Sequence, residues 1–267
     1  MIMKQVTASL LILFCFAACN NEGKKQPEKQ VVANVQEKEM QDAIARFPDS
    51  LLLRENLIQY YRDNGTFDMA IAETNTAIKR DSNNARLWDI KGTLEFEDED
   101  TLNAIKAFEK AIWLFPDPQY IISLGTLYAQ SKNAKALDMA DALLIGKKAG
   151  ADKEALFIKG LYFTYIGDKQ KAIGFFNNCL ALDYTFMFAY REKAIALYDL
   201  HKYEEALNVL NKAVTLQNNF DEGYYWAGRC LEKLNRVNDA IESYKTALQY
   251  DPQYIEAQDA LAKLGVK

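Results

Sequence analysis

The sequence contains few of the residues that interrupt helices, with only 5 prolines and 12 glycines among 267 residues. Alanine, leucine, lysine, glutamate, tyrosine and asparagine make up much of the remainder. This balance favours helices that are joined by short turns and argues against a parallel sheet. Because 49% of the residues are hydrophobic, the chain also has enough apolar material for a substantial core.

The chain lacks a strong excess of charge of either sign. It carries 32 basic and 37 acidic side chains, and its formal net charge is -5. Nucleic acids and anionic membrane surfaces attract proteins through clustered positive charge. We therefore expect no nucleic-acid partner.

Residues that commonly carry out catalysis or bind metals are also scarce. The single histidine, His201, falls in a predicted turn with no cysteine near it, whereas acid-base and zinc chemistry need partner groups within bonding distance. Cys179 and Cys230 fall inside predicted helices, and we interpret them as packing residues rather than as a disulfide. The acidic run 97–100 lacks the alternating spacing and the glycine of an EF-hand, so it predicts a turn before a helix. The sequence thus predicts no catalytic residue, no metal site, no cofactor and no enzyme activity.

The hydrophobic run at the amino end is too short to span a membrane. It follows Lys4 and extends from Val6 to Ala18, whereas a membrane helix needs roughly 20 apolar residues. Its length is typical of a secretion signal. The run ends in Phe16-Ala17-Ala18-Cys19, which resembles the lipobox of bacterial lipoprotein signal peptides. This resemblance implies that residues 1–18 are removed and that Cys19 is acylated. The alternative is an ordinary signal peptide that contains an incidental cysteine.

Residues 19–30 are predicted to form a flexible tether. From Asn20 to Gln30 the segment has no apolar side chain to bury, and a flexible chain of this length typically spans roughly 20 Å. The folded part would then stay close to the membrane surface. Asn20 is not the aspartate that marks inner-membrane retention in the enteric pathway, so the resemblance implies an outer-membrane location in the bacterial cell envelope. The sequence leaves open which leaflet carries the anchor.

Alanines and aromatic residues recur at intervals of 34 residues through the rest of the chain. Ala206 and Ala240 are one such pair, and Ala213 and Ala247 are another. The clearest copy spans residues 221–254 and has small, aromatic and proline residues at fixed places: Tyr224, Ala227, Gly228, Leu231, Ala240, Tyr244, Ala247 and Pro252. This pattern resembles the tetratricopeptide repeat, a helix pair in which small residues allow close approach and large residues fill the gaps.

The resemblance implies an all-α fold, in which helix pairs stack into a right-handed α-solenoid. The six predicted repeats are residues 51–84, 85–118, 119–152, 153–186, 187–220 and 221–254. The third repeat fits only if its internal turn, near residues 131–134, is one or two residues short. Residues 31–50 and 255–267 are predicted to form the amino-terminal and carboxy-terminal capping helices, because a stack must cover its end faces.

In this family the first helix of each pair lines an inner groove, mostly through places 2, 5, 6, 9, 12 and 13 of the repeat. These places are mainly polar in the first two repeats and become aromatic, with arginines, in the last three. Aromatic residues and arginine are typical of binding hot spots. The predicted partner-binding residues are Phe157, Ile158, Leu161, Tyr165, Phe188, Arg191, Tyr198, Tyr225, Trp226 and Arg229.

The pattern with which chaperone-binding relatives hold a terminal carboxylate does not occur at the expected places. Glu55, Gln59 and Ile90 stand where that pattern needs lysine and asparagine. We therefore expect no chaperone tail as the ligand.

These observations favour a membrane-tethered adaptor that binds a protein or peptide partner during the assembly of an envelope machine. By resemblance, lipoproteins of this design include pilus-secretin pilotins and outer-membrane assembly factors. The alternative is a glycan-binding lipoprotein that stacks sugars on Tyr198, Tyr225 and Trp226. A hydrolase would need an acid-base cluster, which the sequence does not show.

Overall fold

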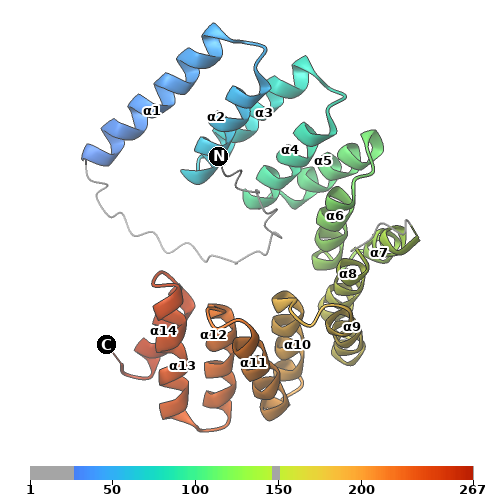
Figure 1. Ribbon diagram of the computed structural model, residues 1–267, viewed down its shortest axis with the longest axis vertical. Coiled ribbons are helices and arrows are strands. Elements are labelled where there is room, and N and C mark those ends of the chain that lie inside the picture. Colours follow the sequence, from blue (N-terminus) through green and yellow to red (C-terminus); the bar gives the residue numbers. More distant parts are fainter. Residues whose placement is uncertain (1–26, 146–150, 267) are drawn as a thin grey trace. The chain divides into compact units, whose positions relative to one another are not determined.

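The computed structural model describes residues 27–145 and 151–266, with side chains from Val35 onwards, and its regular structure is entirely helical (Figure 1). The prediction of an all-α fold is therefore confirmed for these residues. The predicted signal peptide, Cys19 and tether residues 19–26 lie outside the described part of the chain. In chain order the helices are α1 (Pro27–Arg46), α2 (Leu51–Asp63), α3 (Phe67–Arg80), α4 (Ala85–Glu97), α5 (Thr101–Leu114), α6 (Pro118–Gln130), α7 (Lys135–Ile145), α8 (Asp152–Tyr165), α9 (Lys169–Leu182), α10 (Met187–Asp199), α11 (Tyr203–Leu216), α12 (Asp221–Lys233), α13 (Val237–Tyr250) and α14 (Ile255–Lys263).

The helices pack as successive pairs within two compact units. The first unit ends at Leu124 and the second begins at Gly125, so α6 crosses the boundary. Within the first unit α4 packs on α5, and within the second α8 packs on α9 and α12 on α13. In the second unit the first helices of successive pairs also contact one another, α8 with α10 and α10 with α12. Within each unit, successive pairs therefore cover one another, as in a solenoid.

Helix α1 covers the first pair and begins earlier than the sequence predicts. It starts at Pro27, so residues 27–30 of the predicted tether are helical. Proline suits the first position of a helix, because no helical hydrogen bond needs its missing N–H group. The hydroxyl of Tyr61 on α2 donates to Glu37 at 2.8 Å and accepts a hydrogen bond from Gln41 at 3.1 Å. These contacts hold α1 against α2.

The turns inside the pairs repeat one backbone feature, a residue with positive φ. Left-handed backbone favours glycine and tolerates asparagine, and other residues adopt it at some cost. In the third pair the residue comes one position early, at Lys132. The residues at these turns are Gly65, Glu99, Lys132, Gly167, His201 and Asn235.

Small residues allow the paired helices to approach closely. The alanines at place 20 of the repeats have no exposed surface, and they are Ala70, Ala104, Ala136, Ala172, Ala206 and Ala240. Glycines at place 8 lie against aromatic rings of the second helix, as Gly228 does against Tyr244. The predicted alternation of small and large residues thus forms the core.

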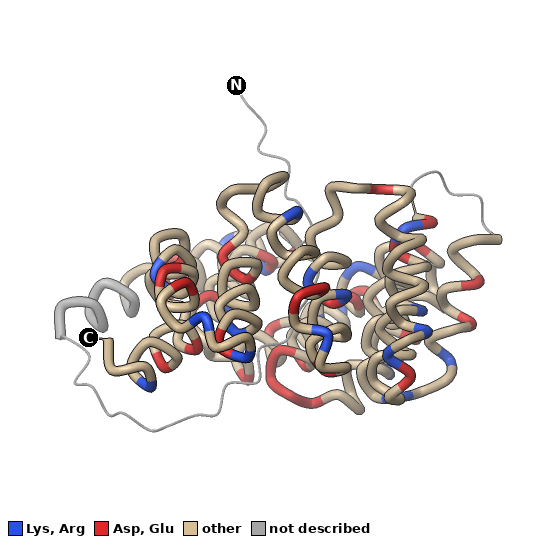
Figure 2. The backbone as a smooth tube through the Cα atoms, turned by 90° about the horizontal axis from the view of Figure 1, so that it is seen from below, with Lys and Arg blue, Asp and Glu red and all other residues tan. Residues whose placement is uncertain are grey.

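The surface of the described helices carries charges of both signs. Acidic and basic residues are both distributed over the helices in Figure 2, and several form ion pairs. Among the described helices, none combines the length and the hydrophobicity that crossing a membrane requires.

Candidate partner-binding surface

Three of the predicted binding residues belong to the core. Phe157, Ile158 and Leu161 on α8 are buried. The ring of Phe157 lies 5.2 Å from that of Phe186 and 5.8 Å from that of Phe176. We therefore correct the prediction for these three residues, because their side chains are covered by neighbouring helices and do not face a partner. Tyr165, at the end of α8, remains 40% exposed.

Arg191 is also buried, because two carboxylates enclose it. Its Nη1 donates to both oxygens of Glu222 on α12 at 2.7 Å, and its Nη2 donates to Glu192 at 2.9 Å. Burial raises the pKa of Glu222, and Arg191 opposes that shift. Arg191 therefore joins α10 to α12, and the prediction that it contacts a partner is corrected. The half-buried ring of Phe188 lies 5.6 Å from the guanidinium of Arg191.

The remaining four predicted residues come together on α10 and α12. We call Tyr198, Tyr225, Trp226 and Arg229 the aromatic–arginine cluster. The Trp226 ring meets the rings of Tyr198 and Tyr225 edge to face, at 5.6 and 5.7 Å. The Arg229 guanidinium lies 5.4 Å from the centres of the Tyr198 and Trp226 rings, a distance at which cations attract aromatic faces.

Within this cluster Tyr225 supports the surface more than it forms it. Its side chain is buried, with its ring 5.0 Å from that of Tyr254 and 5.8 Å from that of Tyr244. Its hydroxyl accepts a hydrogen bond from Nη1 of Arg229 at 2.9 Å. Tyr198, Trp226 and Arg229 are half-buried and stay accessible. The sequence predicts Tyr225 as a partner-binding residue, whereas its burial and its hydrogen bond make it a residue that positions Arg229.

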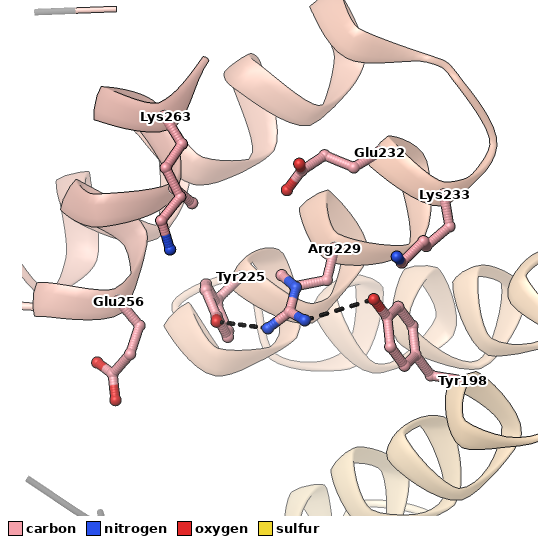
Figure 3. Close-up of a pocket in the computed structure, with 8 residues that line it drawn as sticks. Tyr198, Tyr225, Arg229, Glu232, Lys233, Glu256 and Lys263 are labelled. Carbon is pink, nitrogen blue, oxygen red and sulfur yellow. Dashed lines mark hydrogen bonds between the residues drawn. The ribbon is translucent and has the colours of Figure 1, made fainter. Parts of the chain in front are cut away.

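A pocket of about 350 Å³ adjoins the cluster, between α10, α12 and α14 (Figure 3). Its lining contains three cations and two carboxylates. Glu232 accepts a hydrogen bond from the hydroxyl of Tyr244, and burial together with this glutamate raises the pKa of Tyr244. The lining residues are Tyr198, Tyr225, Arg229, Glu232, Lys233, Glu256, Ala260 and Lys263.

Sequence reasoning missed the contribution of α14, which it treated only as a cap. If Ile255 is counted as place 1 of a further repeat, then Glu256, Ala260 and Lys263 fall at places 2, 6 and 9. Those are inner places by the same rule that selected Trp226 and Arg229. The inner places of the repeat therefore also identify these three residues of α14, a helix predicted only as a cap.

None of the groups considered for chemistry is among the residues that line this pocket. His201 occupies the turn after α10, where its Nδ1 lies 2.7 Å from the hydroxyl of Tyr203. Cys179 and Cys230 are free and buried, and burial raises the pKa of each thiol to about 12, so both stay protonated near neutral pH. Asp100 caps α5 by accepting from the N–H of Asn103 at 3.1 Å. The described residues contain no cluster of side chains suited to hold a metal ion.

The class of protein follows from these helix pairs and from comparison with known proteins. Residues 197–264, which include every residue that lines the pocket, match the family model of the tetratricopeptide repeat. The helix pairs within residues 197–264 thus match the tetratricopeptide repeat, and the described chain has the helical fold of proteins built from such pairs. This fold is generally a non-catalytic scaffold for protein interaction.

Curated relatives match the chain at modest identity. The chain is 26% identical to stress-induced-phosphoprotein 1 of Caenorhabditis elegans over 158 residues, which cover 59% of this chain and 47% of that protein. It is 23% identical to the Hsp70-Hsp90 organizing protein of Triticum aestivum over 249 residues, which cover 86% of this chain and 42% of that protein. The chain spans less than half the length of each relative.

Solved structures agree on the fold. A tetratricopeptide repeat protein from Parabacteroides merdae matches with a TM-score of 0.71 and 17% identity, over 88% of this chain and 93% of that one. PilW, a type IV pilus biogenesis factor, matches with a TM-score of 0.62 and 18% identity, over 78% of this chain and 97% of that one. At these identities the similarity establishes the architecture alone.

Proposed function

We propose that this chain is a lipid-anchored, non-catalytic scaffold that binds a protein or peptide partner in the bacterial cell envelope. The observation that carries the proposal is the aromatic–arginine cluster on α10 and α12. Its accessible members, Tyr198, Trp226 and Arg229, are of the residue types that dominate binding hot spots. They adjoin a pocket, which gives a partner both a surface and a recess to occupy.

The relatives support a binding role rather than a catalytic one. The wheat relative is named as an organizing protein for Hsp70 and Hsp90, which describes a scaffold. The residues of this chain at the chaperone-binding places, Glu55, Gln59 and Ile90, differ from that pattern. The proposed partner is therefore a different protein or peptide.

The membrane anchor is proposed on the resemblance of residues 16–19 to a lipobox. Acyl chains on Cys19 would anchor the chain firmly, since each buried methylene contributes about 0.8 kcal/mol. Mass spectrometry of the amino-terminal peptide tests this directly, and Cys19→Ala should move the protein from the membrane fraction to the soluble fraction. An unmodified Cys19 in mature protein would contradict the anchor. Separation of inner and outer membranes would test the proposed outer-membrane location.

Partner binding is tested by crosslinking and affinity purification from the native envelope. We expect a stoichiometric protein to co-purify with the wild type and to be depleted in Trp226→Ala, with unchanged helicity. Trp113→Ala is the matched control, because Trp113 is 73% exposed on α5, in the other unit. Tyr225→Ala is unsuitable because Tyr225 is buried. Equal capture by the Trp226→Ala and Trp113→Ala variants would contradict the proposal.

Purified envelope polysaccharide serves as the second arm of this experiment. Sugars stack on open, flat aromatic faces, whereas Trp226 meets two tyrosines edge to face and has the Arg229 guanidinium 5.4 Å from its ring centre. This geometry favours a protein partner. Binding to polysaccharide in the absence of any protein partner would replace the scaffold by the glycan-binding alternative.

A further inference from the structure

Arg229 differs from the other covered arginines in having no carboxylate partner among the described residues. Arg54, Arg62 and Arg191 are buried or half-buried, and each pairs with a glutamate. A cation removed from water is costly unless it is paired and hydrogen-bonded. Within the described part of the chain, no carboxylate lies at ion-pair distance from Arg229, although this side chain is half-buried.

The two hydrogen bonds of Arg229 use only part of its donor capacity. Nη1 donates to the hydroxyl of Tyr225 at 2.9 Å, and Nη2 donates to that of Tyr198 at 3.4 Å (Figure 3). A guanidinium has five N–H donors, so three remain without an acceptor among the described residues. The surrounding rings of the cluster fix the position of the group. Arg229 is therefore oriented in advance and keeps donors available for a ligand.

The other charges of the pocket leave a small positive excess. Lys233 and Lys263 line the pocket with Arg229, and neither lysine has an ion pair with a described residue. In the view of Figure 3 their ammonium groups lie on opposite sides of the guanidinium. Glu232 and Glu256 are the acidic lining residues, and Glu232 is engaged by Tyr244. Three cations minus two carboxylates give a formal charge of +1.

We propose that this pocket binds a carboxylate group of the partner, with Arg229 as the central donor and Lys233 and Lys263 as flanking charges. A carboxylate can accept parallel hydrogen bonds from a planar guanidinium. The net charge of the pocket suits a singly charged group better than a doubly charged phosphate. The carboxylate is that of an acidic side chain or of a chain terminus. The inference rests on the proposed function in assigning this group to a protein partner.

Four short peptides test the carboxylate chemistry on the purified chain by chemical-shift titration, which follows millimolar binding. N-acetyl-trialanine offers a terminal carboxylate, and its amide is the matched control. N-acetyl-Ala-Glu-Ala amide offers a side-chain carboxylate, and its glutamine analogue is the matched control. We expect at least one carboxylate peptide to bind about tenfold more tightly than its control, as expected for hydrogen bonds to charged groups. The carboxylate peptide that binds more tightly shows whether the partner's carboxylate is that of a chain terminus or of an acidic side chain.

Substitutions locate the binding site. Arg229→Gln should weaken carboxylate binding about tenfold, and Arg229→Lys should weaken it less, because the charge remains while the planar donor pair is lost. Arg236→Gln is the control, since Arg236 is exposed and pairs with Asp239. Lys263→Gln, at an exposed position, keeps the test valid if Arg229→Gln disturbs the fold.

The inference is overturned if the peptides and their controls bind equally, if none of the four binds, or if binding is unchanged in both Arg229→Gln and Lys263→Gln. These outcomes are separate from those of the envelope experiment. If the wild type and Arg229→Gln captured a partner equally, the result would support the scaffold proposal and contradict the carboxylate site. Carboxylate binding without any envelope partner would support the carboxylate site and contradict the scaffold proposal.

Discussion

Gly160 on α8 lies directly against the ring of Phe176 on α9. A β-carbon built on Gly160 would lie 2.7 Å from Cδ1 of Phe176, whereas carbon atoms in contact are normally separated by about 3.5–4.0 Å. Gly228 and Tyr244 have the same relationship in the last repeat, with 2.5 Å to Cε1. The ring thus fills the volume that a side chain would occupy, and the glycine determines how closely the two helices pack.

Alanine at this position should therefore destabilise the pair. We expect Gly160→Ala to lower the free energy of unfolding by about 1–3 kcal/mol, the usual cost of overpacking. Gly174→Ala on α9 is the matched control, because a β-carbon there meets no atom within 4 Å. That change should stabilise the helix by about 0.5–1 kcal/mol. Urea denaturation followed by circular dichroism measures both, and changes of the same sign would contradict the argument.

The single histidine should act through its backbone conformation. His201 has a φ of 59° at the turn position that Gly167 and Asn235 occupy in neighbouring repeats. His201→Asn should change stability by less than about 0.5 kcal/mol, whereas His201→Val should cost about 1–2 kcal/mol, since branched residues strongly disfavour this conformation. Thermal unfolding distinguishes the two variants. A large loss of partner binding in a well-folded His201→Asn variant would instead indicate a functional histidine.

A half-buried carboxyl in the first unit should make stability depend on pH. Burial raises the pKa of Asp89 to about 6, with Arg86 lowering it and Asp117 raising it further. Because the unfolded chain ionises at lower pH than the folded chain, the folded state loses stability as the pH rises from about 4 to 6, and the loss then stays constant. Asp89→Asn should remove this slope.

The neutral variant should be more stable than the wild type at pH 7 by about 1–3 kcal/mol, because folding raises the pKa of Asp89 to about 6. At pH 4 the two proteins should differ little. Unfolding measured in urea across this range checks the prediction, with Asp117→Asn as a comparison at the neighbouring carboxylate. A stability difference that does not vary with pH would show that Asp89 acts through hydrogen bonding instead.

The sequence could predict the helix pairs because their packing is local and periodic. Ala206 and Ala240 recur at one place, and both are fully buried against the partner helix. It could not predict which inner side chains the next repeat covers. Ile158 is the clearest case, since a β-carbon on Gly125 would lie 2.9 Å from its Cδ1. The missing side chain of Gly125 makes room for Ile158, and the repeat place of Ile158 alone does not reveal this.

Arg191 illustrates the same limit for a charged residue, and it provides the sharpest stability test. Its place in the repeat matched that of a partner-binding residue, yet Glu192 and Glu222 enclose its guanidinium and leave it 5% exposed. Arg191→Leu would leave the half-buried Glu222 without its partner and should cost about 3–5 kcal/mol. Arg236→Gln removes an exposed ion pair with Asp239 and should cost less than about 1 kcal/mol.

A double variant separates the structural role of Arg191 from a binding role. Replacing both Arg191 and Glu222 by leucine leaves only Glu192 without its partner, so it should recover part of the stability that Arg191→Leu loses. Denaturation of the single and double variants, combined with carboxylate titration, measures both properties. Because Arg191 has its carboxylates within the chain, the double variant should still bind the carboxylate peptides through Arg229. Loss of peptide binding in a stable double variant would indicate that Arg191 contributes to binding after all.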